Sequence, residues 1–434
     1  MRGLYPPLAE NLVDSPRRRF LVLGEAVTLG TRPFTFYEFF AGAGLARLGL
    51  GESWSCTWAN DIDPKKAQVY AMNFGVEDFQ LGDVANVDAG ALPSGADMAW
   101  ASFPCQDLSL AGWRRGMSAK RSGAFWGFWR VMRDLADRGD RPPIIVLENV
   151  AGLLYDRTSF VGLCEALAAL GMQFGALVID AKHFLPQSRP RVFVIGVDAR
   201  VDCVGLADAL PWGGPLFPQS IFTAFGALPE ALHEFWRWWF LPAPGTAVGS
   251  LVSVIESEPT GVQWRTHEET DRLLSLMTPL NRNKVEVLRS NGLKAIGMLY
   301  RRTREGRQRP EVRFDGIAGC LRTPNGGSSR QTVVIVEEHR VRSRLLSPRE
   351  AARLMGVPDS YLLPDSYNDA YRAMGDGVAV PVVSWLSKHL LTLLAERCAL
   401  TSQSTRIRGD MPEHTTIPRQ NAEALAASWG ALRR

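Results

Sequence analysis

The sequence predicts an α/β fold built on a doubly wound, mostly parallel sheet. The first observation is a series of short, continuous apolar runs, which are typical of strands buried on both faces. The second is that helical patterns lie between several of these runs, so strands and helices alternate along the chain. The third is that this alternation stops near residue 200, where Gly, Pro, Trp and Arg become frequent. A second, smaller and irregular domain is expected there.

The strand prediction begins with the run from Phe34 to Phe40, which is apolar and aromatic. The segment Ala41-Gly42-Ala43-Gly44 then turns into a helix that starts at Leu45. A second strand follows at 57–62, and Asp63-Pro64 supplies an N-cap and a proline at the first position of the next helix. Further strands are predicted at 98–102, 144–147, 177–179 and 192–197.

Later helices are predicted from their end signals. The pattern from Phe160 to Leu170 is closed by Gly171 as a C-terminal cap. Ser347-Pro348-Arg349-Glu350 opens another helix, and the apolar segment from Val378 to Leu394 forms one that returns to the first domain. The expected parts are an N-terminal extension at 1–33, an α/β domain at 34–204, a second domain at 205–335, returning helices at 336–400 and a polar tail at 401–434.

The composition excludes several classes of protein. Apolar residues make up 46% of the 434 residues, which supports a large core. No stretch approaches the roughly 18 apolar residues of a membrane span, and no apolar signal segment opens the chain. The six cysteines are scattered without zinc or disulfide spacing. We therefore expect no metal, no membrane and a reduced, cytoplasmic setting.

Arginine is concentrated late in the chain. Between Arg301 and Arg353 there are 13 arginines, no lysine and six acids. Arginine is preferred where forked donors meet phosphates or guanine edges, so this surplus indicates a nucleic-acid-binding face, with a solvated charged surface as the alternative. The aromatic run from Phe235 to Phe240 would either stack on bases or, as we prefer, form the core of the smaller domain.

The turn after the first strand predicts a nucleoside cofactor. Gly42 and Gly44 let the backbone approach a ligand, but Arg47 occupies the place of the third glycine of a dinucleotide fingerprint. Asp61, at the end of the next strand, is placed to bind ribose hydroxyls, and Asp83 is placed to accept from an adenine amino group. A site that provides for ribose and adenine but not for phosphates fits S-adenosylmethionine.

Three further strand ends carry reactive side chains. Cys105 follows the strand at 98–102, and although a lone cysteine is more often a core residue, the Gly- and Ser-containing segment 108–123 is expected to be a mobile loop that bears it. Glu148 ends an apolar strand, and these apolar surroundings favour the protonated form of its carboxyl group. The alternative is that Glu148 caps or bridges a neighbouring backbone group. Arg189 and Arg191 alternate at a strand start, so they would share a face and favour the thiolate of Cys105, unless they form surface salt bridges.

In this combination the chain resembles the DNA (cytosine-5) methyltransferases of bacterial and phage restriction-modification systems. The matching motifs are, in order, Phe40–Gly44, Asn60-Asp61, Gly82-Asp83-Val84, Phe103–Gln106, Glu148-Asn149-Val150, Gln187-x-Arg189-x-Arg191 and Gly375-Asp376-Gly377-Val378. The resemblance runs from about residue 34 to 395 and places the variable target-recognition region at about 205 to 335. Leu45 replaces a common glycine, and Asp376 and Gly377 replace a frequent asparagine and a small residue.

The resemblance implies a mechanism and a set of site residues. Cys105 adds to C6 of a cytosine flipped out of the duplex, Glu148 acts at N3, and Arg191 with Arg189 holds O2, so that C5 accepts the methyl group. The cofactor residues implied are Phe40, Gly42, Gly44, Asp61, Ile62, Asp83, Val84, Asp376 and Val378, of which Phe40 and Ile62 resemble the pair that sandwiches the adenine. The expected DNA contacts are Gln106, Ser109, Arg301, Arg302, Arg304, Arg322, Asn325 and Gly326.

Double-stranded DNA is the expected partner, bound by a monomer, and a separately encoded restriction endonuclease is a candidate second partner. Three other functions stay open at this point. The same chemistry on tRNA is disfavoured by the long, arginine-rich recognition region. A silent DNA-binding regulator is disfavoured by the intact reactive residues, and a nicotinamide oxidoreductase by the missing third glycine. The recognised DNA sequence cannot be read from one chain.

Overall fold

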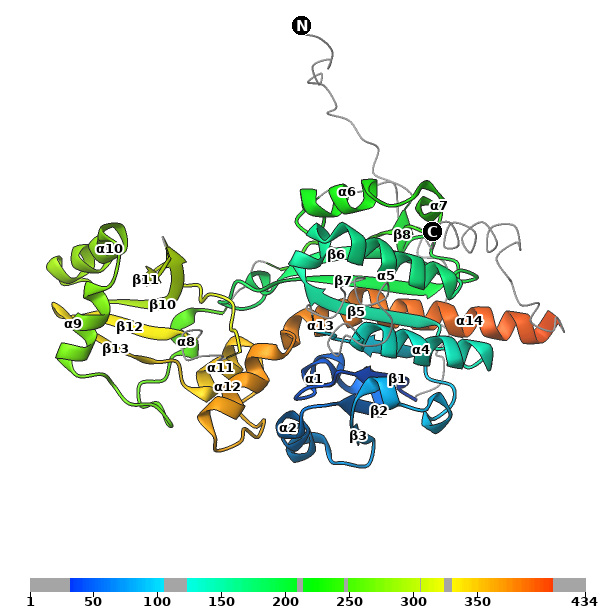
Figure 1. Ribbon diagram of the computed structural model, residues 1–434, viewed down its shortest axis with the longest axis horizontal. Coiled ribbons are helices and arrows are strands. Elements are labelled where there is room, and N and C mark those ends of the chain that lie inside the picture. The colour runs from blue at the N-terminus through cyan, green and yellow to red at the C-terminus, as the bar shows by residue number, and fades with distance from the viewer. Residues whose placement is uncertain are drawn as a thin grey trace, which may run out of the picture. The chain divides into compact units, whose positions relative to one another are not determined.

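The computed structural model describes residues 32–104, 123–208, 214–245, 249–304, 306–323 and 330–408, and the elements below belong to one compact unit that begins at Pro33. Its main sheet has seven strands in the order β3-β2-β1-β4-β5-β7-β6 (Figure 1). The strands are β1 (Phe34–Phe39), β2 (Trp54–Asp61), β3 (Phe79–Leu81), β4 (Met98–Ala101), β5 (Ile144–Val150), β6 (Met172–Asp180) and β7 (Pro190–Asp198). Only β7 pairs antiparallel with its neighbours, so the predicted mostly parallel sheet is confirmed.

Helices cover both faces of this sheet. The longer helices of this part of the chain are α1 (Leu45–Leu50), α2 (Pro64–Phe74), α4 (Ala124–Asp137), α5 (Arg157–Ala169), α11 (Pro348–Leu354), α12 (Tyr367–Asp376), α13 (Val380–Leu386) and α14 (Thr392–Arg408). Phe36 and Phe39 of β1 are an odd number of positions apart, so they point to opposite faces. Phe39 contacts Phe128 of α4, whereas Phe36 contacts Trp54, whose indole donates to Ser387, directly after α13, and to Thr392, the first residue of α14. The sheet is therefore doubly wound, and the chain around Ser387 and Thr392 packs on it.

The end signals read from the sequence act as expected. Asp63 caps α2 by accepting from the Lys65 amide, with Pro64 at the first helical position. Gly171 follows α5 with a φ of 71°, a conformation that glycine adopts without strain. The stretch Tyr367–Ser404 is long and apolar enough to span a membrane by length and composition alone, but 56% of its apolar window is buried inside the protein, as in core helices.

A second sheet is antiparallel, with the order β11-β10-β12-β13 (Figure 1). Its strands are β10 (Ala295–Arg304), β11 (Arg307–Arg313), β12 (Thr332–Glu337) and β13 (Arg340–Leu345), and α9 (His267–Ser275) and α10 (Pro279–Ser290) pack against it. They share a small core made of Leu273, Leu274, Met277, Val285, Leu299, Val312, Val334, Val336 and Val341. The sequence indicated irregular structure here because Arg301 and Arg302 are neighbours on opposite faces of β10 and break the alternation of apolar and polar residues.

The three tryptophans of the aromatic run from Phe235 to Phe240 are buried, but their predicted place in the core of the smaller domain is wrong. Trp236 and Trp239 are at most 3% exposed and belong to the core of the large sheet. The Phe174 amide of β6 donates to the Phe235 carbonyl (2.8 Å), and the Arg237 amide donates to the Phe174 carbonyl (2.7 Å). Because β6 is an edge strand, its free backbone groups need partners, and this segment supplies them. Burial likewise excludes Trp236 and Trp239 from stacking on bases.

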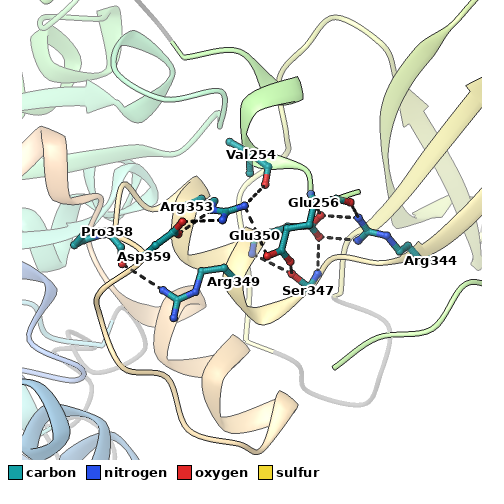
Figure 2. A network of polar contacts seen from close by, with 9 residues as sticks. All are labelled: Val254, Glu256, Arg344, Ser347, Arg349, Glu350, Arg353, Pro358 and Asp359. Carbon is teal, nitrogen blue, oxygen red and sulfur yellow. Dashed lines mark hydrogen bonds and ion pairs between the residues drawn. The ribbon is translucent and has the colours of Figure 1, made fainter. Parts of the chain in front are cut away.

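Short elements complete this region: β8 (Ala207–Asp208), α6 (Gln219–Gly226), α7 (Glu230–His233), β9 (Trp238–Trp239) and α8 (Leu251–Val254). A polar network then joins the chain that enters the second sheet to the chain that leaves it (Figure 2). Arg344 of β13 and Glu350 of α11 are fully buried and bonded through both guanidinium ends, at 2.7 and 2.6 Å. Ser347 and Glu350 form the capping box of α11, which confirms the predicted helix start. Glu256 accepts from the Ser347 hydroxyl at 2.8 Å.

Candidate active site

The strand order brings the end of β4, Glu148 and Arg191 to one edge of the main sheet. β4 leads towards Cys105, β5 carries Glu148, and β4, β5 and β7 are consecutive neighbours. β7 runs antiparallel to β5, so its start lies at the edge where β5 ends, and Arg191 pairs in register with Val150. Open α/β sheets place their sites at this carboxyl edge. Because β7 is antiparallel, the motif of Arg189 and Arg191 stands at the start of β7, whereas the motifs of Cys105 and Glu148 come at or after the ends of β4 and β5 in the sequence.

Cys105 itself, with Gln106 and Ser109 and the segment expected to carry them, lies outside the described residues. The chain is described up to Pro104, and Asn149 fixes this approach: its side-chain amide donates to the Phe103 carbonyl at 3.0 Å. Asn149 is 4% exposed, so this bond is shielded from water. The sequence motif contained Asn149 but suggested no role for it. The structure shows that it ties the β4 exit to the strand that carries Glu148.

Glu148 and Arg191 form an ion pair, with Glu148 Oε1 at 3.2 Å from Arg191 Nε and side-chain exposures of 8% and 15%. Neither is a freely solvated surface group. The pair places an acceptor and a forked donor side by side at the sheet edge, where a planar ring with adjacent ring nitrogen and carbonyl groups could be bound by both.

Arg189 makes contacts of a different kind from Arg191. It is 1% exposed and precedes the first residue of β7, so strand alternation does not apply to it. Its guanidinium donates to the carbonyls of Leu321 (2.9 Å), Gly375 (2.7 Å) and Gly377 (2.6 Å). Burial, followed by the charge of Arg191, lowers the pKa of Arg189 to about 10. Arg189 thus connects the start of β7 to the segment at Leu321 and to the last sequence motif, at Gly375 and Gly377.

Backbone hydrogen bonds also connect the segment around Ala318 to the residues just before β7. The Ser188 amide donates to the Ala318 carbonyl (3.0 Å), and the Ala318 amide donates to the Pro186 carbonyl (2.7 Å). Gln187, which is fully buried, accepts from the Leu321 amide at 3.2 Å and donates to the Leu354 carbonyl at 2.6 Å. Gln187 is a second motif residue whose positioning role the sequence did not reveal. Through these bonds, the segment after β11 reaches the active-site edge.

The turn after β1 has the geometry of a nucleoside site. Phe40, Gly42 and Gly44 all have positive φ, of 56°, 58° and 73°. The Gly42 amide donates to Asp61 Oδ2 at 2.8 Å, which brings the acid at the end of β2 against the turn. A Cβ on Gly44 would lie 2.4 Å from the Phe74 ring, so only glycine fits there. These residues fit a ribose-containing ligand, because a carboxylate with free lone pairs stands beside an open backbone turn.

The other predicted cofactor residues differ in how far their side chains are exposed to solvent. Ile62 is 64% exposed, next to Asp61, and Phe40 is half-buried across the turn. Val84 and Val378 are 3% exposed, so their side chains pack in the core and only their backbone is available to a ligand. Asp83 accepts from the Ala85 amide at 2.9 Å.

The departures from the family pattern compensate one another in space. A Cβ on Gly377 would lie 2.4 Å from Leu45 Cδ1, so the missing side chain makes room for the larger residue after the turn. Asp376 forms an ion pair with Lys66 of α2 at 2.8 Å and accepts from the Thr323 hydroxyl. The last motif therefore packs directly on the cofactor turn.

The predicted DNA contacts lie on both faces of the β10–β11 hairpin. Residues paired in register share a face, and Leu299 and Val312 belong to the helix-covered core. Arg301, an even number of positions from Leu299, lies on that face, whereas Tyr300, Arg302 and Arg309 lie on the other. Arg322 is exposed. The side chain of Arg304, and Asn325 and Gly326 entirely, lie outside the described residues.

Fold and site together define an α/β methyltransferase, and comparison with known proteins agrees. A family model of C-5 cytosine-specific DNA methylases matches residues 34–392. Type II methyltransferase M.HpaII of Haemophilus parainfluenzae is 26% identical over 413 residues, covering 89% of this chain and 98% of the relative. M.HhaI of Haemophilus parahaemolyticus is 26% identical over 359 residues, covering 82% and 93%.

Solved structures show the same fold at low sequence identity. The Entamoeba histolytica methyltransferase EhMeth superposes with a TM-score of 0.54 at 14% identity, covering 84% of this chain and 99% of that one. The Dnmt2 methyltransferase of S. pombe has a TM-score of 0.50 at 17% identity, with coverage of 84% and 99%. The chain belongs to the C-5 cytosine-specific DNA methylase family, and it is therefore a cytosine-5 methyltransferase.

Proposed function

We propose that this enzyme methylates C5 of a cytosine flipped out of duplex DNA, with Cys105 as the nucleophile. The observation that carries this proposal is the convergence at one sheet edge: the strand leading to Cys105, Glu148 and Arg191 come from three adjacent strands, and Glu148 contacts Arg191 at 3.2 Å. Asn149 supports it by holding the backbone two residues before Cys105.

The proposed steps assign one task to each side chain. The Cys105 thiolate forms a bond to C6, the ring electrons shift towards N3 and C5, and N3 takes a proton from Glu148, which must carry one at this step. Arg191, next to Glu148, donates to the O2 oxygen. S-adenosylmethionine, when bound, supplies the methyl group, whose bond to sulfur breaks as C5 accepts it. The C5 proton passes to solvent, the bond between C6 and the thiolate breaks, and the N3 proton returns to Glu148, which restores the aromatic ring and frees Cys105.

We assign Arg189 to positioning. Its buried guanidinium donates to the carbonyls of Leu321, Gly375 and Gly377. It therefore holds these backbone segments in place, and Arg191 is the arginine that contacts the substrate. For the cofactor we propose that Asp61 binds the ribose hydroxyls, that Gly42 and Gly44 form the floor, that Phe40 and Ile62 flank the adenine, and that Asp83, Val84, Asp376 and Val378 complete the site.

The DNA-reading surface is proposed to be the face of the β10–β11 hairpin that bears Tyr300, Arg302 and Arg309. Arg302 stacks on the Tyr300 ring at 4.9 Å and lies 3.6 Å from Glu311, so its fork is held in place. A Cβ on Gly319 would lie 3.7 Å from Tyr300, so this face adjoins the segment that reaches Arg189. Arg301 lies on the helix-covered face and is not part of the proposed surface.

Broader expectations about domains, DNA partner, oligomeric state, location and biological role belong to the same proposal. Residues 34–204 and 336–400 carry the chemistry, and recognition lies within 205–335 and the strands beside it. The enzyme binds double-stranded DNA as a monomer in the cytoplasm. Its similarity to Type II methyltransferases supports a role in restriction and modification, with a separately encoded endonuclease as partner.

Two assays test this proposal. Tritiated methyl transfer to duplex DNA should require Cys105, so Cys105→Ser should abolish it while DNA binding persists; transfer to tRNA but not to DNA would replace the proposed substrate. For the reading surface, Arg302→Ala and Arg309→Ala should each lower the dependence of log Kd on log salt by about 0.9 if one phosphate contact is lost. Arg301→Ala is the matched control and should leave it unchanged; the reverse pattern would move the surface to the other face.

A further inference from the structure

Three arginines lie close together beside α12, and the proposed mechanism uses none of them. Arg301 belongs to β10, Arg330 precedes β12 and Arg265 precedes α9. Leu299 and Thr332 are paired in register, so continuing this register by two residues sets Arg301 opposite Arg330 on the helix-covered face of the small sheet. The Arg265 guanidinium lies on that face too, because it donates to the Thr332 hydroxyl at 3.5 Å. We call these three residues the arginine cluster.

The arginine cluster also contacts the start of α12. The Arg330 guanidinium lies over the Tyr367 ring, with 5.2 Å between its Cζ and the ring centroid, and it donates to the side-chain carbonyl of Asn368. Burial raises the pKa of Tyr367 to about 12, and the charges of Arg330 and Arg265 oppose this rise. Burial, followed by the charge of Arg301, lowers the pKa of Arg265. The three cations are therefore near enough to act on one another or on the same tyrosine.

No carboxylate in the described part of the chain forms an ion pair with the arginine cluster. In contrast, Arg302, the next residue along β10, lies 3.6 Å from Glu311. The acid that acts on Arg265 is Glu269, but its carboxylate accepts from a backbone amide in the capping box of α9. The Nε of Arg330 is buried and has no hydrogen-bond partner. Like charges directly opposite each other destabilise a sheet, so an anion bound among these arginines would relieve an existing repulsion.

The chemistry of the cluster selects a phosphate group. Planar guanidinium forks match the oxygens of phosphate with two parallel hydrogen bonds each, and Arg265 and Arg330 are half-buried, which strengthens such bonds. The cluster lies on the opposite face of the sheet from Tyr300 and Arg302, so a duplex on the proposed reading surface does not cover it. The DNA backbone is therefore not the source of phosphate that this position favours.

We propose that the arginine cluster binds a phosphate group of a free phosphorylated ligand. This site is separate from the proposed reaction and does not depend on it. Because Arg330 contacts α12 while Arg265 and Arg301 belong to the small sheet, the bound phosphate would join the small sheet to the catalytic region. The ligand would then stabilise the protein as well as bind to it.

Calorimetric titration of inorganic pyrophosphate into the full-length protein without DNA tests this. Arg265→Gln and Arg330→Gln should each weaken pyrophosphate binding about tenfold or more, as expected when a charge-assisted bond is lost. Arg302→Gln is the matched control, because Arg302 is the neighbour of Arg301 on β10 and points to the opposite face. It should leave the affinity unchanged. Pyrophosphate should also raise the melting temperature of the wild-type protein and of Arg302→Gln, but not that of Arg330→Gln.

The outcomes separate this inference from the proposed function. Arg301→Gln, at the exposed member of the cluster, should also weaken pyrophosphate, and its melting temperature without ligand shows whether it is folded. Absence of pyrophosphate binding by the wild-type protein, or equal affinity in all variants, overturns the inference. A smaller salt dependence of DNA binding in Arg265→Gln and Arg330→Gln without any pyrophosphate binding would assign the cluster to the DNA backbone, which also overturns it. Cys105→Ser should bind pyrophosphate like the wild type, so failure of the proposed reaction leaves this result unaffected.

Discussion

Replacing Arg189 by methionine tests whether this residue supports the site or contacts the substrate. The guanidinium makes three hydrogen bonds to buried carbonyls, at 2.6 to 2.9 Å. Bonds from a charged donor contribute about 1.5–3 kcal/mol each, and removing the donor leaves the carbonyls unsatisfied. Removing a buried cation offsets part of this loss, since burial already lowers the pKa of Arg189 to about 10. The expected net decrease in the free energy of unfolding is about 3 kcal/mol.

Urea unfolding followed by tryptophan fluorescence measures this loss. Arg191→Met is the comparison: its ion pair with Glu148 is mostly buried, so we expect a loss of stability of similar size, about 3 kcal/mol, together with loss of methyl transfer. Wild-type stability of Arg189→Met combined with full loss of activity would refute the positioning role and return Arg189 to the substrate.

Two further predictions follow from the buried core. Burial raises the pKa of Glu38 to about 8, from 4.5 in the unfolded chain, so the protonated form stabilises the fold; this stability is complete below about 4.5 and is lost as the pH rises through 8. Each pH unit in that window should cost about 1.4 kcal/mol, and Glu38→Gln should flatten the slope of unfolding free energy against pH; an unchanged slope would contradict this. Gly175→Ala would place a Cβ 1.8 Å from the Arg237 carbonyl oxygen, whereas Gly226→Ala meets nothing within 4 Å. Thermal unfolding should therefore show a loss of more than about 3 kcal/mol for the first and almost none for the second, and equal melting temperatures would show that the segment at Arg237 is not packed on β6.

The sheet was predictable because its central strands are buried on both faces. Every residue of β4 is buried, so its continuous apolar run identifies it without reference to its neighbours. β10 was missed because Arg301 lies on the same face as the buried Leu299, so the neighbouring Arg301 and Arg302 break the alternation of apolar and polar residues. The aromatic run from Phe235 to Phe240 could be predicted only in part. Its composition indicates burial, but the strand on which it packs could not be predicted, because that depends on Gly175 and on the free edge of β6, which are distant in the sequence.

The candidate site shows the same division. The sequence singled out Cys105, Glu148 and Arg191 because the chemistry demands these residue types at strand ends, and their roles stay predictions. The roles of Arg189, Asn149 and Gln187 depend on backbone carbonyls and amides far away in the sequence, and the ion pair of Lys66 with Asp376 joins positions more than 300 residues apart. Such partners become visible only when the chain is folded.

The central claim is that Cys105 forms a bond to C6 of the target cytosine. The most direct measurement is incubation of the enzyme with S-adenosylmethionine and duplex DNA that contains 5-fluorocytosine, followed by denaturing electrophoresis and peptide mass spectrometry. Fluorine at C5 cannot leave as a proton, so elimination is blocked and we predict a stable adduct on the peptide that contains Cys105, absent in Cys105→Ser. Active enzyme that methylates ordinary cytosine but forms no adduct, or an adduct at another residue, would contradict the account.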